Sequence, residues 1–442
     1  MEKTIFHIDV NSAFLSWSAV KRLKEDPAAQ DIRLIPSIVG GDVKTRHGIV
    51  TAKSIPAKKY GIKTGEPVVK ALQKCPELVI VRSDFDTYRE YSAAFIAILR
   101  KYSPKVEQAS IDEAFLDMTE VLADFPDTRP MAQKTAGQIR EEISRTLGFT
   151  VNVGISTNKL LAKMASDFAK PDRTHTLYPE EIPEKMWPLP IGDLYGCGAK
   201  TADKLRTLGV LTIGDAAALP EDVLRSYLGE KAGEYISLSS RGIGSDAVHT
   251  DRDDAKSYSN EVTTPYDITD ENYDDEMPPL LLKLCEKVSG RMKRDGVYAG
   301  TLSVIVKTDD FHRRSMQQKL TDVSNDPDIF YTAALSLMEK LLRGEDGLFA
   351  AGTGGVRLVG IGASDLDKGA YRQLTLTDII NKAEGLKTAE AGRPDETCPD
   401  EEADASGEPD DQRTRTLAEM LQGLQERFGS KIVQKGPENL LH

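Results

Sequence analysis

The sequence predicts a multidomain protein of the α+β class. At 442 residues, of which 40% are hydrophobic, the chain exceeds what one core organises and supports two to four domains. Helix and strand patterns alternate over its first 170 or so residues without a repeated strand–helix–strand unit, which favours an α+β layer over a doubly wound sheet. A run of short helices separated by glycines follows, and then a second mixed piece.

The N-terminal part combines buried strands with amphipathic helices. β-Branched and aromatic residues predict a strand at 4–10, and Asn11 and Ser12 are placed to cap the helix that follows. The Gly-punctuated stretch 40–65 predicts short strands and turns in a small subdomain. The further helices are expected at 13–23, 88–102, 131–147 and 158–168, and the further strands at 78–81, 106–109, 110–118 and 150–155.

The remaining chain divides into three segments. Short helices are expected over 190–241. The next piece predicts strands at 257–264, 298–308, 315–322 and 356–362, with helices at 278–295 and 328–342. Residues 383–413, rich in Glu, Asp, Gly, Pro and Thr, are expected to be disordered, and a short amphipathic helix is expected at 416–428.

The formal net charge of −13 argues at first against a nucleic-acid partner. Much of the acid, however, lies in the two runs 246–276 and 384–411. A local basic groove is compatible with a global acidic charge. The basic clusters lie outside these runs, at Lys58-Lys59, at Arg291, Lys293 and Arg294, and at Arg313-Arg314.

Cysteine usage and hydropathy indicate the compartment. Cys75, Cys197, Cys285 and Cys398 are widely spaced, which favours reduced thiols over a zinc site or a disulfide framework. No stretch predicts a signal peptide or a membrane span, so we expect a cytoplasmic protein.

Three acids lie in unusually apolar surroundings. Asp9 ends a buried strand, and Asp112 and Glu113 lie within the run SIDEAFL. Burying carboxylates costs several kcal/mol each unless a cation or hydrogen bonds compensate. Because side chains alternate along a strand, Asp112 and Glu113 could share one metal site only at a bend or a hairpin rim. Two surface acids and a helix cap are the alternative interpretation, and spacing alone leaves both open.

If the acids converge, they offer three hard oxygen donors without histidine or thiol. Such a set favours Mg²⁺ or Mn²⁺ over zinc. Two such ions, about 3.5–4 Å apart, stabilise the attacking and leaving oxygens of phosphoryl transfer.

Five sequence blocks resemble the Y family of DNA polymerases, with the bacterial DNA polymerase IV branch most similar. They occur in the family's order and spacing, and the resemblance covers residues 4–365. The blocks are HIDVNSAF (7–14), IPAKKYGIKTGEP (55–67), ASIDEAFLD (109–117), VGISTNKLLAKMASDFAKP (153–171) and GCGAKTADKL (196–205).

The resemblance implies a right-hand polymerase fold. It implies a palm at 1–10 and 83–173, small fingers at 11–82, and a helical thumb with a helix-hairpin-helix at 174–241. An additional α/β little-finger DNA-binding domain at 250–366 and a flexible acidic tail at 367–442 complete it. The implied function is template-directed addition of dNTPs to a primer 3′ end, with low fidelity and lesion bypass in DNA repair.

The family's roles transfer to matching positions. Asp9, Asp112 and Glu113 match the catalytic carboxylates that hold two Mg²⁺ ions, for which Mn²⁺ can substitute, and the backbone carbonyl of Val10 completes a metal shell. Phe14 matches the aromatic gate that excludes ribonucleotides. The alternative interpretation is that Phe14 is only a core residue at a helix start.

Three further positions would contact the incoming nucleotide. Lys159 matches a lysine that contacts the triphosphate. Ile55 and Lys58 fall where the family commonly has a tyrosine and an arginine. Ile55 offers no hydroxyl, and Lys58 offers a point charge rather than a bidentate fork.

The DNA and partner contacts implied by the resemblance lie further along the chain. Gly196, Gly198, Lys200 and Thr201 resemble a helix-hairpin-helix, whose backbone N–H groups approach a phosphate. A plain turn is the alternative. Arg291, Arg313 and Arg314 are the expected phosphate contacts of the little finger, or else solvated charges.

A short peptide follows the last predicted strand. Gln373, Leu374 and Leu376 resemble the motif that docks bacterial polymerases on the sliding clamp. Thr377 replaces its usual aromatic residue, so the motif is degenerate. Primer-template DNA and dNTPs are the expected partners of a monomeric enzyme.

Two rival functions are considered. A cyclic-dinucleotide synthase is suggested by Gly40-Gly41-Asp42, but Val43-Lys44 follows where that motif has Glu-Phe. A non-catalytic Y-family scaffold in a mutagenesis complex typically loses the carboxylates, all three of which are present here. A primer-extension assay separates these possibilities.

Overall fold

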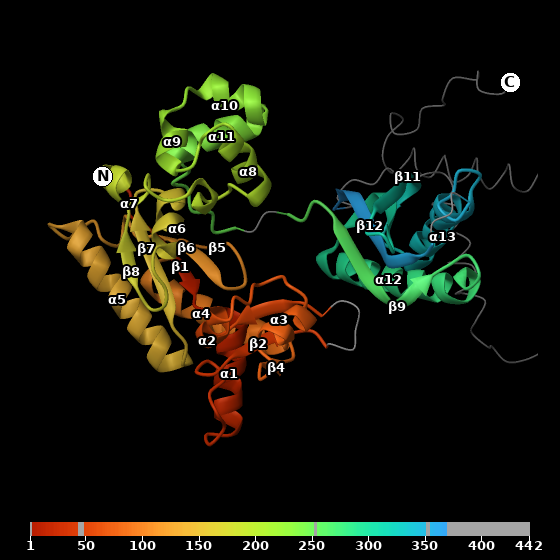
Figure 1. Ribbon diagram of the computed structural model, residues 1–442, viewed down its shortest axis with the longest axis horizontal. Helices are drawn as coiled ribbons and strands as arrows, with labels where there is room; N and C mark the ends of the chain where they lie inside the picture. The colour runs from red at the N-terminus through yellow and green to blue at the C-terminus, as the bar shows by residue number, and fades with distance from the viewer. Residues whose placement is uncertain (1, 43–47, 252–253, 351–353, 369–442) are drawn as a thin grey trace, which may run out of the picture. The chain divides into compact units, whose positions relative to one another are not determined.

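The structure is a computed structural model that describes residues 2–42, 48–251, 254–350 and 354–368 (Figure 1). The parts before and after residues 252–253 are described separately. The predicted disordered segment 383–413, the predicted helix 416–428, the Gln373 peptide and Cys398 lie outside the described residues. Among the described helices, none is long and apolar enough to cross a membrane.

A five-stranded sheet forms the centre of the N-terminal part, in the order β5-β6-β1-β7-β8. The strands are β1 (Ile5–Val10), β5 (Val106–Gln108), β6 (Glu113–Asp117), β7 (Val151–Ser156) and β8 (Thr174–Thr176). Within this sheet β7 and β8 pair in parallel, and the other described neighbours pair antiparallel. This mixed, mainly antiparallel sheet confirms the α+β class. β8 joins the sheet just beyond the expected palm boundary at residue 173.

Helices cover both faces of this sheet, so every residue of β1 and β7 is buried. Phe6 and Ile8 of β1 belong to the core with α4 (Phe85–Tyr102) and α5 (Thr128–Leu147). Ile5 packs instead against Phe115 and against Ala162 of α6 (Lys159–Asp167). Since side chains alternate along a strand, His7 and Asp9 share the α6 face with Ile5.

The predicted strand at 110–118 is shorter than expected. Residues 110–112 form a bend, and β6 begins at Glu113. The helix α1 (Ala13–Glu25) starts where predicted, but the expected cap is wrong. Ser12 has φ 48° and makes no side-chain cap hydrogen bond. Ser16 Oγ instead donates to the Asn11 carbonyl at 2.6 Å.

A small subdomain packs beside the central sheet, as the Gly-punctuated region predicts. It contains a three-stranded sheet in the order β3-β2-β4 and two short helices around a core that includes Ile38, Ile62 and Val68. Its elements are β2 (Ser37–Gly40), β3 (Val50–Lys53), α2 (Ile55–Lys59), α3 (Val68–Lys74) and β4 (Val79–Val81).

Short helices follow β8, as predicted. Their core continues into Leu161 and Met164 of α6, which fixes them against the central domain. They are η1 (Pro179–Glu181), α7 (Ile182–Lys185), η2 (Ile191–Asp193), α8 (Ala199–Thr207), α9 (Ile213–Ala218), α10 (Glu221–Leu228) and α11 (Glu230–Ser240).

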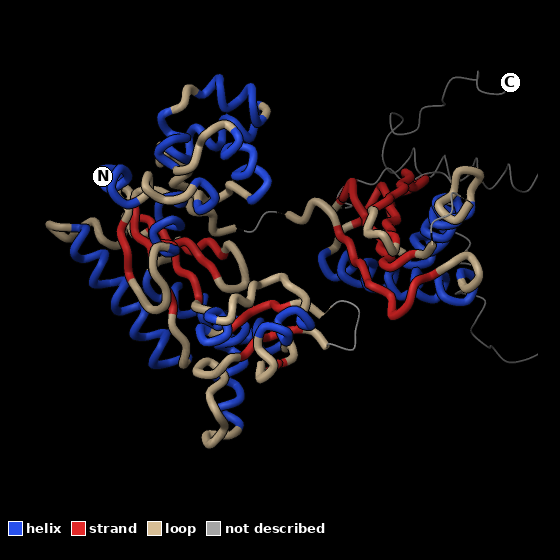
Figure 2. The backbone as a smooth tube through the Cα atoms, in the orientation of Figure 1, coloured by secondary structure: helices blue, strands red, loops and turns tan. Residues whose placement is uncertain are grey.

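The C-terminal domain is a four-stranded antiparallel sheet in the order β11-β10-β12-β9, packed against two helices (Figure 2). The strands are β9 (Tyr258–Ile268), β10 (Tyr298–Thr308), β11 (Arg313–Ser324) and β12 (Val356–Asp367), and the helices are α12 (Tyr273–Asp295) and α13 (Pro327–Arg343).

The start of α12 and the end of β12 differ most from prediction. α12 begins at Tyr273 rather than at residue 278, and Pro278 and Pro279 lie inside it. Three acids of its first turn, Asp274, Asp275 and Glu276, favour the helix there because they complement the helix dipole. β12 continues past Gly362 because Asp367 pairs with Tyr298.

Candidate active site

Two of the predicted carboxylates face each other across neighbouring strands. Asp9 of β1 is the register partner of Glu113 of β6. Asp9 is only 7% exposed, and both side chains lie on the face covered by α6. The sheet therefore brings together two acids that are 104 positions apart in the sequence.

Asp112 reaches the same edge through the bend that precedes β6. Its carbonyl accepts a hydrogen bond from the Val10 N–H at 3.0 Å, which ties the bend to the end of β1. Its Oδ1 accepts from Ser110 Oγ at 2.7 Å. Because the chain turns at this point, strict strand alternation no longer separates Asp112 from Glu113.

Two lysines surround the facing carboxylates. Lys163 Nζ lies 2.7 Å from Glu113 Oε1 and 3.5 Å from Asp9 Oδ2. Lys170 Nζ lies 2.6 Å from Asp9 Oδ1. Asp167 pairs with both lysines, at 3.3 Å and 2.9 Å. The sequence analysis missed this cluster, although Lys159, Lys163 and Asp167 follow the spacing of one helix face.

The pKa values of Asp9 and Glu113 are shifted in opposite directions. Burial, together with the hydrogen bond to Glu113, raises the pKa of Asp9 to about 7 against the opposing effect of Lys170. His7, Asp9 and Lys163 hold the pKa of Glu113 well below its usual range. Positive charge close to Asp9 therefore favours its ionised form.

A buried histidine lies beneath the pair. His7 Nδ1 is 2.8 Å from Ser166 Oγ, and Nε2 faces Glu113 Oε2 at 3.8 Å. Burial lowers the His7 pKa, so the ring is neutral at neutral pH.

The donor chemistry fits a hard divalent cation. Asp9, Asp112 and Glu113 offer oxygen ligands alone, and Lys163 and Lys170 lie on the Asp9 and Glu113 oxygens that a metal would take. Within the described part of the chain, no three acidic, histidine or cysteine side chains are placed together closely enough to hold a metal.

Phe14 lies in an aromatic cluster at the start of α1. Its ring stacks on Tyr88 with centroids 4.6 Å apart and planes 14° apart. Trp17 and Phe85 complete the contacts, at 6.0 Å and 6.1 Å. Phe14 is half-buried, so both its predicted role as a gate and a packing role are compatible with its position.

The predicted nucleotide contacts lie on two elements. Lys159 opens α6 after the Asn158 cap and lies with its ammonium 5.4 Å from the Phe115 ring centroid. Ile55 begins α2, is 53% exposed, and follows Ser54, whose side chain caps the helix. Lys58 lies one turn further along the same short helix and is exposed.

The helix-hairpin-helix residues begin α8. Gly198 is its N-cap, and a side chain there would meet no atom within 4 Å. The first N–H groups of α8, at Lys200 and Thr201, have no partner within the helix and can approach a phosphate. Gly196 has φ +84°, and a Cβ there would lie 2.4 Å from the Tyr235 hydroxyl.

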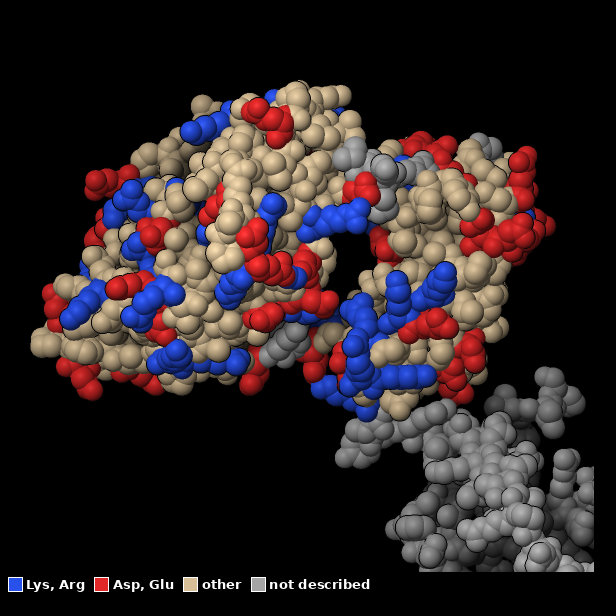
Figure 3. Space-filling view, turned by 90° about the horizontal axis from the view of Figure 1, so that it is seen from below, with Lys and Arg blue, Asp and Glu red and all other residues tan. Residues whose placement is uncertain are grey.

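Basic side chains gather on one side of the C-terminal domain (Figure 3). Arg313 and Arg314 are exposed on β11, and Arg313 forms an ion pair with Glu261 of β9. Arg291 lies over the Tyr258 ring and donates to the Ser259 carbonyl at 3.0 Å.

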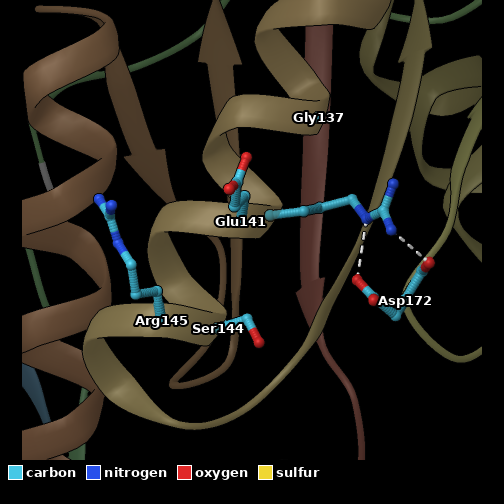
Figure 4. A pocket seen from close by; sticks show the side chains of 6 residues that line it. Gly137, Glu141, Ser144, Arg145 and Asp172 are labelled. Carbon is cyan, nitrogen blue, oxygen red and sulfur yellow. Dashed lines mark hydrogen bonds and ion pairs between the residues drawn. The ribbon is translucent and has the colours of Figure 1, made fainter.

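A pocket of about 340 Å³ on α5 lies apart from these groups (Figure 4). Within it, Arg140 donates to Asp172 Oδ1 at 2.9 Å and to the Asp172 carbonyl at 2.6 Å. The N–H of Asp172 donates to Asn11 Oδ1 at 2.9 Å. These contacts fix the loop that carries Lys170, so we assign the pocket a structural role.

Known protein families and individual proteins are similar in sequence to this chain. Sequence models of the impB/mucB/samB family, of its C-terminal domain and of the IMS family HHH motif match residues 8–167, 255–376 and 179–210. DNA polymerase IV of Clostridium acetobutylicum is 42% identical, and the match covers 86% of this chain and 91% of that protein. DNA polymerase IV 1 of Bacillus subtilis is 34% identical, with 98% and 92% covered.

The fold agrees. A Y-family DNA polymerase chimera of Dbh and Dpo4 superposes with a TM-score of 0.69 at 25% identity, covering 82% of this chain and 98% of that one. The fold and these matches define a DNA polymerase of the right-hand kind. The chain belongs to the Y family, in its DNA polymerase IV group.

Proposed function

We propose that this DNA-directed DNA polymerase performs translesion synthesis with Asp9, Asp112 and Glu113 as its catalytic carboxylates. The observation that carries the proposal is the facing pair Asp9–Glu113, with Asp112 held at the adjoining bend by the Val10 N–H. The presence of all three carboxylates disfavours the non-catalytic scaffold, which typically loses them.

We propose Mg²⁺ as the physiological metal, with Mn²⁺ able to substitute. Two such ions, when bound, would supply electrostatic stabilisation of the attacking and leaving oxygens. The chain's own residues prepare the centre for them. Lys163 and Lys170 keep Asp9 and Glu113 in place, and the Val10 carbonyl is the proposed backbone ligand.

We propose that the nucleotide site lies between α1, α2 and the start of α6. Lys159 would contact the triphosphate, with Lys58 as a second charge and Ile55 as an apolar neighbour. The Phe14 ring, supported by its stack on Tyr88, would exclude a ribose 2′-hydroxyl. Because the stack on Tyr88 restricts the rotamers of Phe14, the ring stays in place and would discriminate more strongly against ribonucleotides.

We propose that the DNA is held at two places. The N-terminal turn of α8, with Gly196, Gly198, Lys200 and Thr201, would bind one backbone phosphate. Arg291, Arg313 and Arg314 would bind others, and Arg313 must then leave Glu261. Low fidelity and lesion bypass are part of the proposal.

We also propose a partner, an oligomeric state and a compartment. The Gln373, Leu374 and Leu376 peptide would bind a sliding clamp weakly. The protein would act as a monomer, and it would act in the cytoplasm.

Primer extension with and without Mg²⁺ tests the proposal. We expect metal-dependent, template-directed incorporation by the parent chain, and loss of that incorporation with retained DNA binding in Asp9→Asn. Retained DNA binding without any extension by the parent would favour the scaffold.

A further inference from the structure

One carboxylate joins Lys159 to the segment that follows the thumb. The two oxygens of Glu107, on β5, lie 2.9 Å and 2.8 Å from Lys159 Nζ. Oε2 also accepts a hydrogen bond from the His249 N–H at 2.9 Å. The side chains of Lys159 and Glu107 are only 19% and 22% exposed, so water competes weakly for them.

The segment 242–249 is bound to the first turn of α6 by backbone contacts. The Gly242 carbonyl accepts from Asn158 Nδ2 at 2.9 Å. The Ser245 carbonyl accepts from the Lys159 N–H at 2.9 Å. The segment therefore holds both the cap of α6 and its first residue.

Packing fixes the same segment against the sheet. A Cβ at Gly244 would lie 2.7 Å from the Leu160 Cβ, so the backbone is in direct contact with α6. Val248 packs against the buried cluster of Ile5, Phe115 and Ala162. His249 thus reaches Glu107 from a defined position.

We propose that Glu107 is a positioning residue that competes with the incoming triphosphate for Lys159, and that docking of the segment 242–249 sets the strength of this competition. The proposal rests on the proposed contact between Lys159 and the triphosphate. It adds a carboxylate and a linker segment to the nucleotide site.

The competition follows from charge and geometry. Both carboxylate oxygens of Glu107 engage the Lys159 ammonium, which has three N–H donors. A triphosphate carries several negative charges and draws the ammonium away. The His249 N–H restricts the Glu107 rotamer, and this preorganisation strengthens its hold on Lys159.

Thermodynamic linkage determines how the His249–Glu107 contact and nucleotide binding affect each other. If the His249 contact strengthens the hold of Glu107 on Lys159, then it weakens nucleotide binding. Nucleotide binding must weaken the His249 contact by the same factor. A bound nucleotide therefore loosens the end of the segment 242–249.

Nucleotide affinity of the full-length protein is the first readout. A ternary complex on a primer that lacks its 3′-hydroxyl gives the Kd for a dNTP without turnover. Glu107→Gln keeps an acceptor for the His249 N–H but removes the charge, so we expect a Kd about three- to tenfold lower. Lys159→Ala should raise the Kd, and Glu107→Gln should have no further effect in that background.

A matched control and a second variant accompany the Kd measurement on Glu107→Gln. Glu120→Gln removes the charge from another lysine–carboxylate pair, with Lys105 at 2.7 Å, and should leave the Kd unchanged. His249→Pro removes the N–H donor and should lower the Kd in the same direction as Glu107→Gln. It serves as the test if Glu107→Gln does not fold.

Hydrogen exchange is the second readout. Adding dNTP to the complex should increase exchange in residues 245–249 of the parent protein and leave it unchanged in Lys159→Ala. A purely structural Glu107 would produce no such nucleotide-dependent change.

The outcomes separate this inference from the proposed function. A Kd that rises or stays constant in Glu107→Gln, while Lys159→Ala weakens binding, overturns the competition and leaves the polymerase assignment intact. A Kd unaffected by Lys159→Ala overturns the role of Lys159 and the inference with it. Primer extension by the parent chain tests the polymerase function independently.

Discussion

Gly154 of β7 is where α6 and the sheet approach each other most closely. A Cβ at this position would lie 2.0 Å from the Ala162 carbonyl oxygen, 2.5 Å from the Ser166 nitrogen and 3.0 Å from the Ala165 Cβ. Two of these three atoms are backbone, so no side-chain rotation relieves the clash. Gly154→Ala must therefore displace α6 by at least about 1 Å, because real Cβ atoms essentially never approach another heavy atom within 3.0 Å.

Both stability and activity should respond. Overpacking of this kind costs about 3 kcal/mol of unfolding free energy, at the upper end of such substitutions. Because α6 carries Lys159 and Lys163, a displacement of about 1 Å should also lower the rate of primer extension by about a hundredfold. Urea denaturation and single-nucleotide extension measure the two effects.

Gly137→Ala is the matched control. Gly137 lies within α5, and an added Cβ would meet no atom within 4 Å. An alanine in a helix interior should stabilise the protein by about 0.5–1 kcal/mol and leave extension unchanged. A Gly154→Ala protein as stable and as active as the parent would refute the reasoning about the α6–β7 contact.

Three further predictions concern the site and the tail. Asp112→Ala and Glu113→Ala should each abolish Mg²⁺-dependent extension while DNA binding in a gel-shift assay is retained, because phosphate contacts lie elsewhere. Phe14→Ala should lower discrimination against ribonucleotides by orders of magnitude in competitive incorporation, since the ring no longer fills the space beneath C2′. In a peptide spanning residues 370–381, Thr377→Phe should tighten clamp binding about ten- to a hundredfold in a titration, because a buried ring adds roughly 1.5–3 kcal/mol.

Each has a contrary outcome. Extension within tenfold of the parent in either carboxylate variant removes that residue from the catalytic set. A Phe14→Ala enzyme that rejects ribonucleotides as strongly as the parent leaves Phe14 with a packing role alone. Absence of clamp binding by both peptides makes the Gln373 resemblance a chance one.

Local patterns predicted the elements well where one periodicity dominates. The strand expected at 298–308 has the bounds of β10, and the helix expected at 328–342 differs from α13 by one residue at each end. The start of α12 was missed because Pro278 resembles a first helical residue, whereas the acids before it already begin the helix.

The candidate site was predicted only in part. The strand pattern of residues 4–10 predicted Asp9 near a strand end, and β1 ends at Val10. Strand alternation required a bend if Asp112 and Glu113 were to share one site, and residues 110–112 form a bend before β6. The contacts of Lys163 and Lys170 with Asp9 depend on how α6 and the following loop pack on β1, over separations of 154 and 161 residues. No local pattern encodes such contacts, and the same holds for Glu107 and His249.

If Arg313 binds a DNA phosphate, as proposed, its ion pair with Glu261 affects how DNA binding responds to ionic strength. When an arginine without a carboxylate partner binds a phosphate, the mobile anions around the arginine and the cations condensed on the DNA are released. Arg313 is already neutralised by a fixed carboxylate, so its transfer to a phosphate exposes Glu261, which attracts a mobile cation in turn. The net number of ions released is then smaller than the number of phosphate contacts. The affinity for DNA should therefore fall less steeply with added salt than the number of contacting arginines implies. Glu261→Gln should make this salt dependence steeper.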